Sequence, residues 1–123
     1  MGVKVLIIDD SATIRRQVGE ALTGLGHEVL EAGDGLEGAS MIERTPELKL
    51  VICDVNMPRM TGMQMLHKLR DKGVKSPPVV MLTTEGDQKM VQEARQLGVK
   101  GWLVKPLNLS TFGDVVRHVV ASS

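Results

Sequence analysis

The run Leu50-Val51-Ile52-Cys53, followed at once by the carboxylate of Asp54, is the clearest indication of the fold class of this chain. An unbroken apolar run of this length is typical of a strand buried on both faces of a parallel sheet, because a strand with one wet face would alternate with polar residues. Three other runs share this character, and a weaker segment, His27–Ala32, could add a strand at or near an edge. The three other runs are Val5–Ile8, Val79–Leu82 and Trp102–Val104.

The segments between these runs have a helical period, with apolar residues at intervals of three and four. The stripes are Ile14, Val18, Ala21, Leu22 and Leu25; Leu36, Ala39 and Ile42; Met63, Leu66 and Leu69; Met90, Val91, Ala94 and Leu97; and Phe112, Val115, Val116, Val119 and Val120. Glycines fall just past three of these helices, where a residue without Cβ suits a left-handed cap or tight turn. They are Gly24 and Gly26, Gly73, and Gly98 and Gly101. Five strands alternating with five helices predict a doubly wound α/β fold with a five-stranded parallel sheet and right-handed crossovers.

Length and composition restrict the function. We expect residues 1–123 to form one domain with no output domain, since no linker, repeat or low-complexity stretch divides the 123 residues. Fifteen Lys and Arg balance fifteen Asp and Glu, so there is no basic excess to attract nucleic acid or an anionic membrane. The apolar runs are too short to insert into a membrane.

Cysteine and histidine usage bears on the compartment and on metal binding. The single Cys53 cannot form an internal disulfide, and we expect a protein of the reducing cytoplasm. His27, His67 and His118 lie far apart, without partners at the spacing of zinc ligands. We interpret them as surface or partly buried histidines.

Polar residues follow four of the predicted strands. Asp9 and Asp10 end the first, Asp54 the third, Thr83 the fourth, and the fifth leads into Lys105 and Pro106. Each of Asp9, Asp10 and Thr83 taken alone could simply be the N-cap of the next helix. Together they would converge on one edge of a parallel sheet, which is where open α/β sheets bind their ligands.

Three carboxylates at one edge indicate a cation. Each pair of charges 4 Å apart repels by about 1 kcal/mol in water and about 4 kcal/mol at an effective dielectric of 20. Mg²⁺ offsets such repulsion and prefers carboxylates together with water and phosphate oxygens. Lys105 and Thr83 offer a cation and a hydroxyl to a phosphoryl oxygen. Asp54, at the end of a central strand, is the candidate nucleophile for phosphoryl transfer.

These residues resemble the receiver domains of bacterial response regulators, in particular the single-domain, CheY-like ones. The resemblance extends from Val3 to Val120, and it rests on five fragments whose order and spacing are specific together. They are Leu6-Ile7-Ile8-Asp9-Asp10-Ser11, Val51-Ile52-Cys53-Asp54-Val55-Asn56-Met57-Pro58, Met60-Thr61-Gly62, Leu82-Thr83-Thr84 and Gly101-Trp102-Leu103-Val104-Lys105-Pro106. The resemblance implies a flavodoxin-like (βα)5 sheet with the strand order 2-1-3-4-5.

The resemblance also implies the activity, a phosphorelay of the chemotaxis or motility type. A sensor histidine kinase or histidine phosphotransfer protein would donate a phosphoryl group to Asp54, and the domain itself would catalyse both this transfer and the later hydrolysis of the acyl phosphate. Asp10 and Asp54 would bind Mg²⁺ through their side chains, Asn56 through its backbone carbonyl, and Asp9 through water.

The phosphoryl group would be held by Thr83 and Lys105. A cis peptide before Pro106, a bond type with a small cis penalty, would aim Lys105 at the site. A downstream protein would bind the fourth helix, fifth strand and fifth helix.

Departures from the common family pattern concern the switch and the hydrolysis. Thr84 stands where a smaller residue is usual, so we expect narrower access to the phosphoryl group. The switch position holds Trp102, whose large indole either limits the inward rotation expected behind Thr83 or is a fixed packing residue. Asn56 and Glu85 resemble the pair that flanks the hydrolytic water, which predicts quick loss of the phosphoryl group.

Two alternatives remain from the sequence. A phosphatase of the haloacid dehalogenase type also uses a strand-end Asp with Mg²⁺, but it expects one residue between two aspartates, whereas Asp9 and Asp10 are adjacent. A receiver-like interaction module without phosphorylation-dependent switching would be expected to lack the acceptor or the lysine. Both Asp54 and Lys105 are present.

Overall fold

The structure is a computed structural model of the 123-residue chain, and it describes residues 2–84 and 88–122. Strands and helices alternate along these residues. In chain order they are β1 (Lys4–Ile8), α1 (Ala12–Gly24), β2 (Glu28–Ala32), α2 (Gly35–Arg44), β3 (Leu48–Asp54), α3 (Gly62–Asp71), β4 (Val79–Thr83), α4 (Gln88–Gln96), β5 (Val99–Val104) and α5 (Leu109–Ala121).

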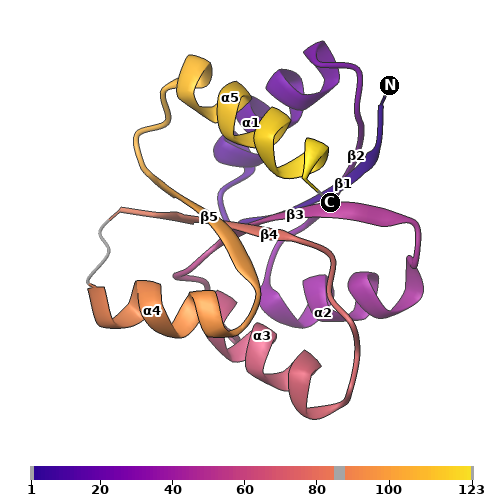
Figure 1. The fold of residues 1–123 in the computed structure, drawn as a ribbon, viewed down its shortest axis with the longest axis vertical. Coiled ribbons are helices and arrows are strands. Elements are labelled where there is room, and N and C mark those ends of the chain that lie inside the picture. The colour runs from indigo at the N-terminus through magenta and orange to yellow at the C-terminus, as the bar shows by residue number, and fades with distance from the viewer. Residues whose placement is uncertain (1, 85–87, 123) are drawn as a thin grey trace.

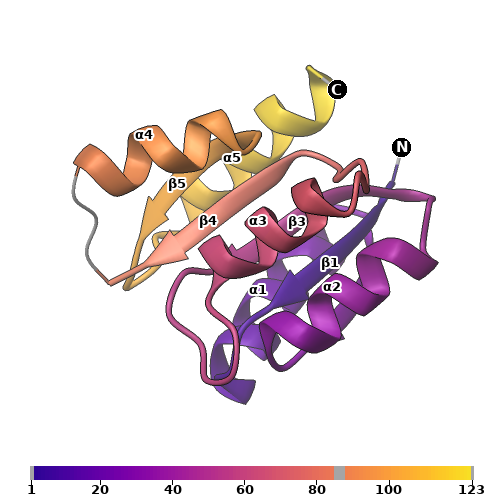
Figure 2. The same cartoon turned by 90° about the horizontal axis from the view of Figure 1, so that it is seen from below.

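The five strands form one parallel sheet in the order β2-β1-β3-β4-β5. Helices α1 and α5 cover one face, and α2, α3 and α4 cover the other (Figure 1). Seen from below, the strand arrows of β1 and β4 point to the same side of the molecule (Figure 2). The predicted α/β fold and the strand order implied by the resemblance are both confirmed.

The sheet separates two apolar cores, because successive side chains of a strand point to opposite faces. On β1, Val5 and Ile7 join a cluster with Val18 of α1 and Phe112 of α5. Leu6 and Ile8 join the other cluster, with Ile42 of α2 and Leu66 of α3. All four β1 side chains are fully buried, which is why this strand has an unbroken apolar sequence.

Two of the predicted turn glycines do not lie past a helix. Gly24 is the last residue of α1. Gly101 does not lie past the end of a helix: α4 ends at Gln96, and Gly101 is inside β5, where it pairs with Val80. A Cβ at Gly101 would lie 3.2 Å from side-chain atoms of both Val80 and Val115. Helix α5 therefore packs closely on this strand. The other predicted turn glycines fit better, since Gly26, Gly73 and Gly98 all have positive φ.

The helices are short. No helix in the described ranges is both long enough and apolar enough to cross a lipid bilayer.

Candidate functional site

The predicted site residues lie at the carboxyl edge of the sheet, the side to which the arrows in Figure 2 point. Asp9 directly follows β1, Asp54 and Thr83 are the last residues of β3 and β4, and Lys105 directly follows β5. Backbone hydrogen bonds continue past the strand ends: the Val55 amide donates to the Leu82 carbonyl at 3.0 Å, and the Lys105 amide donates to the Thr83 carbonyl at 2.7 Å. These bonds keep the ends of β3, β4 and β5 in register at the site.

Three carboxylates meet at this edge. Carboxylate oxygens of Asp9, Asp10 and Asp54 all lie within 4.8 Å of one another. Asp9 is fully buried, Asp54 is buried and Asp10 is exposed. Neighbouring amides orient two of them, since the Ser11 amide donates to Asp9 Oδ1 at 2.8 Å and the Asn56 amide donates to Asp54 Oδ1 at 3.2 Å. The arrangement is a cluster of oxygen ligands, partly open to water, of the kind that hard divalent cations prefer.

Lys105 supplies a cation to this cluster. Its ammonium lies 3.0 Å from Asp9 Oδ2 and 3.3 Å from Asp54 Oδ2, and its side chain is only 14% exposed. Burial by itself would lower the pKa of Lys105, but the hydrogen bond to Asp9 and the charges of Asp9 and Asp54 outweigh burial and raise this pKa. Lys105 is therefore held in its charged form, between the ends of β1 and β3.

Asp54 is a carboxylate in an unfavourable environment. Burial, followed by the nearby charge of Asp9, raises the pKa of Asp54 above its ordinary value, although Lys105 and the Asn56 amide act in the opposite direction. One ammonium does not fully offset three clustered carboxylates. A bound cation or a positively polarised group would relieve this excess of negative charge.

The remaining predicted residues lie around the same edge. Thr83 is fully buried, Thr84 is exposed, and Asn56 is exposed just after β3. The peptide bond between Lys105 and Pro106 is cis. Glu85 lies outside the described residues.

Trp102 is partly buried on β5. It pairs in register with Met81 of β4 and packs against the core on the α2, α3 and α4 side. Its contact with this core fits the interpretation of Trp102 as a packing residue.

One residue that contacts the site was missed from the sequence. The Arg15 guanidinium donates from Nη1 to the backbone carbonyl of Asp9 at 2.7 Å. The apolar stripe of α1 predicts which of its residues face the core, but it contains no signal for a polar side chain that turns back toward the preceding strand.

Comparison with known proteins identifies the family. The sequence profile described as "Response regulator receiver domain" matches residues 5–117, which is nearly the whole chain. The chain belongs to the response regulator receiver domains. The phosphatase alternative is thereby set aside, because receiver domains are signalling proteins and not conventional enzymes.

Similar receiver proteins come from bacterial chemotaxis. A "Chemotaxis protein CheY homolog" of Campylobacter jejuni is 36% identical over 122 residues, which are 98% of this chain and 94% of that protein. "Chemotaxis protein CheY1" of Helicobacter pylori is 41% identical, covering 98% of this chain and 99% of the relative. Among solved structures, chemotaxis protein CheY4 of Vibrio cholerae has a TM-score of 0.87 and 38% identity, covering 97% of this chain and 99% of that one. The receiver domain acts in phosphorelay regulation of the chemotaxis type, and such a domain has phosphodonor and downstream protein partners.

A complex offers a further structural likeness. The structure described as the "CheX-CheY-BeF3-Mg+2 complex from Borrelia burgdorferi" has a TM-score of 0.88 and 28% identity, and it covers 95% of this chain and 88% of that one.

Proposed function

We propose that this receiver domain accepts a phosphoryl group on Asp54 from the phosphohistidine of a sensor kinase or a histidine phosphotransfer protein. A carboxylate oxygen of Asp54 forms a bond to phosphorus while the bond from phosphorus to the donor's imidazole nitrogen breaks, and the bonding electron pair returns to that nitrogen. The product is an acyl phosphate on Asp54. The observation that carries the proposal is the position of Lys105, whose ammonium lies beside both Asp9 and Asp54.

The charge of the site supports a divalent cation. Three carboxylates within 4.8 Å of one another face the single ammonium of Lys105, so Asp9, Asp10 and Asp54 have the donor type and the excess negative charge that suit Mg²⁺. The Asn56 carbonyl is proposed as a further ligand, and Asp9 as one that acts through water. When bound, Mg²⁺ would offset negative charge on the oxygens of the transferred group. The chemotaxis complex of Borrelia burgdorferi, which contains Mg²⁺ and a beryllium fluoride, supports this assignment by likeness.

The chain's own groups would also hold the transferred group. Lys105 lies 3.3 Å from Asp54 Oδ2, close enough for its ammonium to contact a phosphoryl oxygen added to that carboxylate. Thr83 ends the strand next to β3 and would donate its hydroxyl to another oxygen. Thr84 is exposed at the mouth of the site and would narrow access to the phosphoryl group.

Hydrolysis is proposed as a second step catalysed by the domain itself. Asn56 is exposed two residues beyond Asp54, where it would flank the approach of a water to phosphorus, and Glu85 is proposed as its counterpart. We expect the acyl phosphate to decay within minutes. A half-life of hours, measured in the purified protein, would contradict the hydrolytic role of this pair.

The downstream protein is proposed to bind the surface formed by α4, β5 and α5. The exposed polar side chains of α4 include Lys89, Gln92, Glu93 and Gln96. Next to them on β5, Trp102 is partly buried and Val104 is 56% exposed. A surface that mixes apolar and polar side chains suits binding of a partner protein.

Intact-mass spectrometry tests the proposed function. We expect one added phosphoryl group when the purified chain is mixed with Mg²⁺ and acetyl phosphate, and no addition in Asp54→Asn. Asp71→Asn, which changes an exposed aspartate at the end of α3, is the matched control and should be labelled like the unchanged protein. Absence of an adduct with acetyl phosphate and with a phosphohistidine donor would favour the inert interaction module.

A further inference from the structure

The backbone of Asp9 receives a contact that the proposed chemistry does not use. The amide of Asp9 donates to the Ala32 carbonyl of β2 at 3.1 Å. Its two carboxylate oxygens accept from the Ser11 amide and from Lys105. The Asp9 carbonyl then accepts from the guanidinium of Arg15, at 2.7 Å. This last bond comes from the side chain of Arg15, which lies in α1, six residues after Asp9.

The bonded carbonyl belongs to the peptide unit that joins Asp9 to Asp10. Because a peptide unit is planar, fixing its oxygen also fixes the direction in which the chain enters Asp10. Asp10 is exposed, so packing restrains its carboxylate less than it restrains Asp9. The Arg15 contact therefore bears on the relative placement of two of the three clustered carboxylates.

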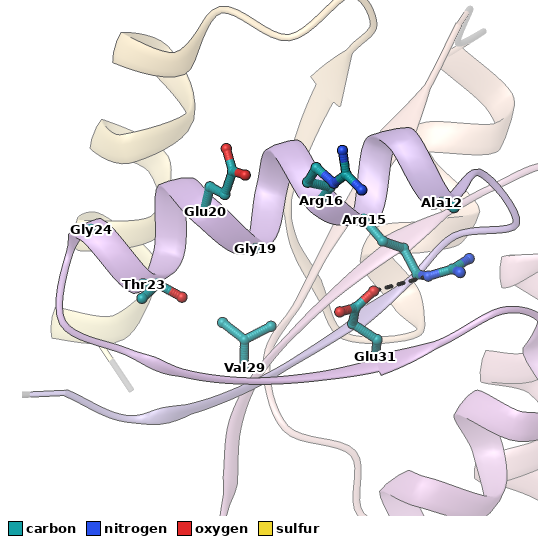
Figure 3. Close-up of a pocket in the computed structure, with 9 residues that line it drawn as sticks. All are labelled: Ala12, Arg15, Arg16, Gly19, Glu20, Thr23, Gly24, Val29 and Glu31. Atoms are coloured by element: carbon teal, nitrogen blue, oxygen red, sulfur yellow. Dashed lines mark hydrogen bonds and ion pairs between the residues drawn. The ribbon is translucent and has the colours of Figure 1, made fainter.

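Arg15 is itself held in place. Its Nε donates to Glu31 Oε1 at 3.0 Å, and its side chain is 23% exposed. Arg15 lies in the groove between α1 and the edge strand β2 and extends toward Glu31. The side chain of Arg16, the next residue, points away from Glu31 (Figure 3). The planar guanidinium thus contacts β2 through one nitrogen and the Asp9 carbonyl through another, a geometry that a lysine cannot reproduce.

We propose that Arg15 is a positioning residue for the divalent-cation site, which acts by fixing the Asp9–Asp10 peptide and not by touching the cation or the phosphoryl group. The inference rests on the proposed magnesium site. Groups that orient metal ligands from outside commonly change metal affinity by tenfold or more when they are removed. Arg15 is such a group for a pair of adjacent ligands.

A purely electrostatic role predicts the opposite sign. Removing a positive charge near a cation site strengthens cation binding by Coulomb's law, whereas removing a positioning contact weakens it. Arg15→Gln removes the charge and the contact together. Arg16→Gln removes a charge from the adjacent residue, whose side chain points away from Glu31. Arg15→Lys keeps the charge and loses the two-point contact.

Calorimetric titration of each full-length variant with Mg²⁺ alone, at constant ionic strength, tests the proposal. We expect Arg15→Gln to bind Mg²⁺ about tenfold more weakly than the unchanged protein and Arg15→Lys about threefold more weakly. Arg16→Gln should bind as tightly as the unchanged protein or slightly more tightly. If Arg15→Gln does not fold, as judged by circular dichroism, the comparison of Arg15→Lys with Arg16→Gln decides.

Two results would overturn the positioning role, and they differ from each other. If the unchanged protein binds Mg²⁺ and both Arg15 variants bind it as tightly as Arg16→Gln does, the role of Arg15 is wrong while the metal site stands. If the unchanged protein does not bind Mg²⁺, the metal site is wrong and the role of Arg15 falls with it.

Discussion

Asp54 combines two properties that oppose each other in a folded protein. Its side chain is 8% exposed, and it lies in a cluster with two other carboxylates. Burial and the charge of Asp9 raise the pKa of Asp54, which means that the ionised form is less favourable in the folded state than in the unfolded chain. The residue proposed to accept the phosphoryl group therefore lowers the stability of the fold at neutral pH.

This property predicts that Asp54→Asn stabilises the protein when no divalent cation is present. The sign follows from proton linkage: between the ordinary pKa of an aspartate and the raised pKa of Asp54, the folded state binds more protons, so the free energy of unfolding falls as pH rises. Well above the raised pKa the full cost is present, and Asn removes it. We expect a melting temperature about 3 °C higher than that of the unchanged protein at pH 7.5 in EDTA, which corresponds to about 1 kcal/mol.

The dependence on conditions distinguishes this cause from a general effect of the substitution. At a pH below the ordinary range of aspartate both states are protonated, and the advantage of Asp54→Asn should disappear. Saturating Mg²⁺ should reverse the difference in stability, because Mg²⁺ stabilises the unchanged protein, which has all the proposed ligands, more than it stabilises Asp54→Asn. An advantage that is the same at every pH and Mg²⁺ concentration would contradict the electrostatic explanation.

At the scale of the elements, the start of α3 shows how closely a helix approaches the site. A Cβ built at Gly62, the first residue of α3, would lie 2.6 Å from the Asp54 carbonyl oxygen and 2.8 Å from Met81 Cε. The Gly62 amide donates to the Val55 carbonyl at 2.9 Å, so the helix is bonded to the end of β3. The side chain of Thr61 caps the helix in a capping box. No side chain larger than hydrogen fits at residue 62 without moving α3 or β3.

Gly62→Ala is therefore expected to lower the free energy of unfolding by about 2 kcal/mol, in the range that overpacking produces. Gly24→Ala is the matched control, because a Cβ at Gly24 meets no atom within 4 Å. Gly24 ends α1, and replacing a helical glycine by alanine stabilises by up to about 1 kcal/mol. Urea denaturation of both variants measures the two changes. Equal free energies of unfolding for Gly62→Ala and Gly24→Ala would mean that α3 can shift to accommodate the added methyl group at little cost, and that its contact with the end of β3 is loose.

The elements also show what the sequence could and could not predict. The unbroken apolar runs of β1, β3 and β4 predicted central strands correctly, because strands buried on both faces have no need of polar residues. The prediction for β5 was three residues short, since its first half includes Lys100 and Gly101 and has no apolar run. Sheet pairing with β4 and packing of α5 override the weak local preference there.

The residues of the site also fall into those that the sequence could predict and one that it could not. The predicted site residues all lie at or just past the ends of strands, so the parallel sheet brings them together, and their proximity was predictable from topology. They are Asp9, Asp10, Asp54, Thr83 and Lys105. Arg15 was not predictable, because its contact depends on how its side chain leaves α1 and returns to the Asp9 carbonyl. Sequence periodicity gives the face of a helix to which a residue belongs, but it does not give the path of a long polar side chain.

At the scale of the whole molecule, Lys105 joins parts of the chain that are far apart in sequence. It follows the edge strand β5, yet its ammonium contacts Asp9 after β1, 96 positions earlier, and Asp54 at the end of β3. These contacts connect the ends of β5, β1 and β3 at the carboxyl edge of the sheet. The same group that would hold the phosphoryl group thus helps to neutralise charge in the folded protein before any phosphoryl group arrives.

Lys105→Met should consequently destabilise the protein by about 3 kcal/mol at neutral pH in EDTA, because removing one partner of a buried ion pair leaves the other charges uncompensated. Lys72→Met is the matched control. Lys72 pairs with Glu43 at 2.7 Å between α3 and α2, but both side chains are well exposed, at 49% and 32%, and such a surface pair contributes no more than about 1 kcal/mol. Thermal unfolding measures both variants.

Mg²⁺ and acid should each reduce the deficit of Lys105→Met, since a cation or a proton on Asp54 replaces part of the lost positive charge. Adding Asp54→Asn to Lys105→Met should do the same, so that the double variant is more stable than Lys105→Met alone. The coupling follows because the two residues are in contact and their effects are not additive. If the deficit of Lys105→Met is unchanged by Mg²⁺, by acid and by Asp54→Asn, then Lys105 stabilises the fold through the packing of its side chain, and the carboxylates tolerate one another without it.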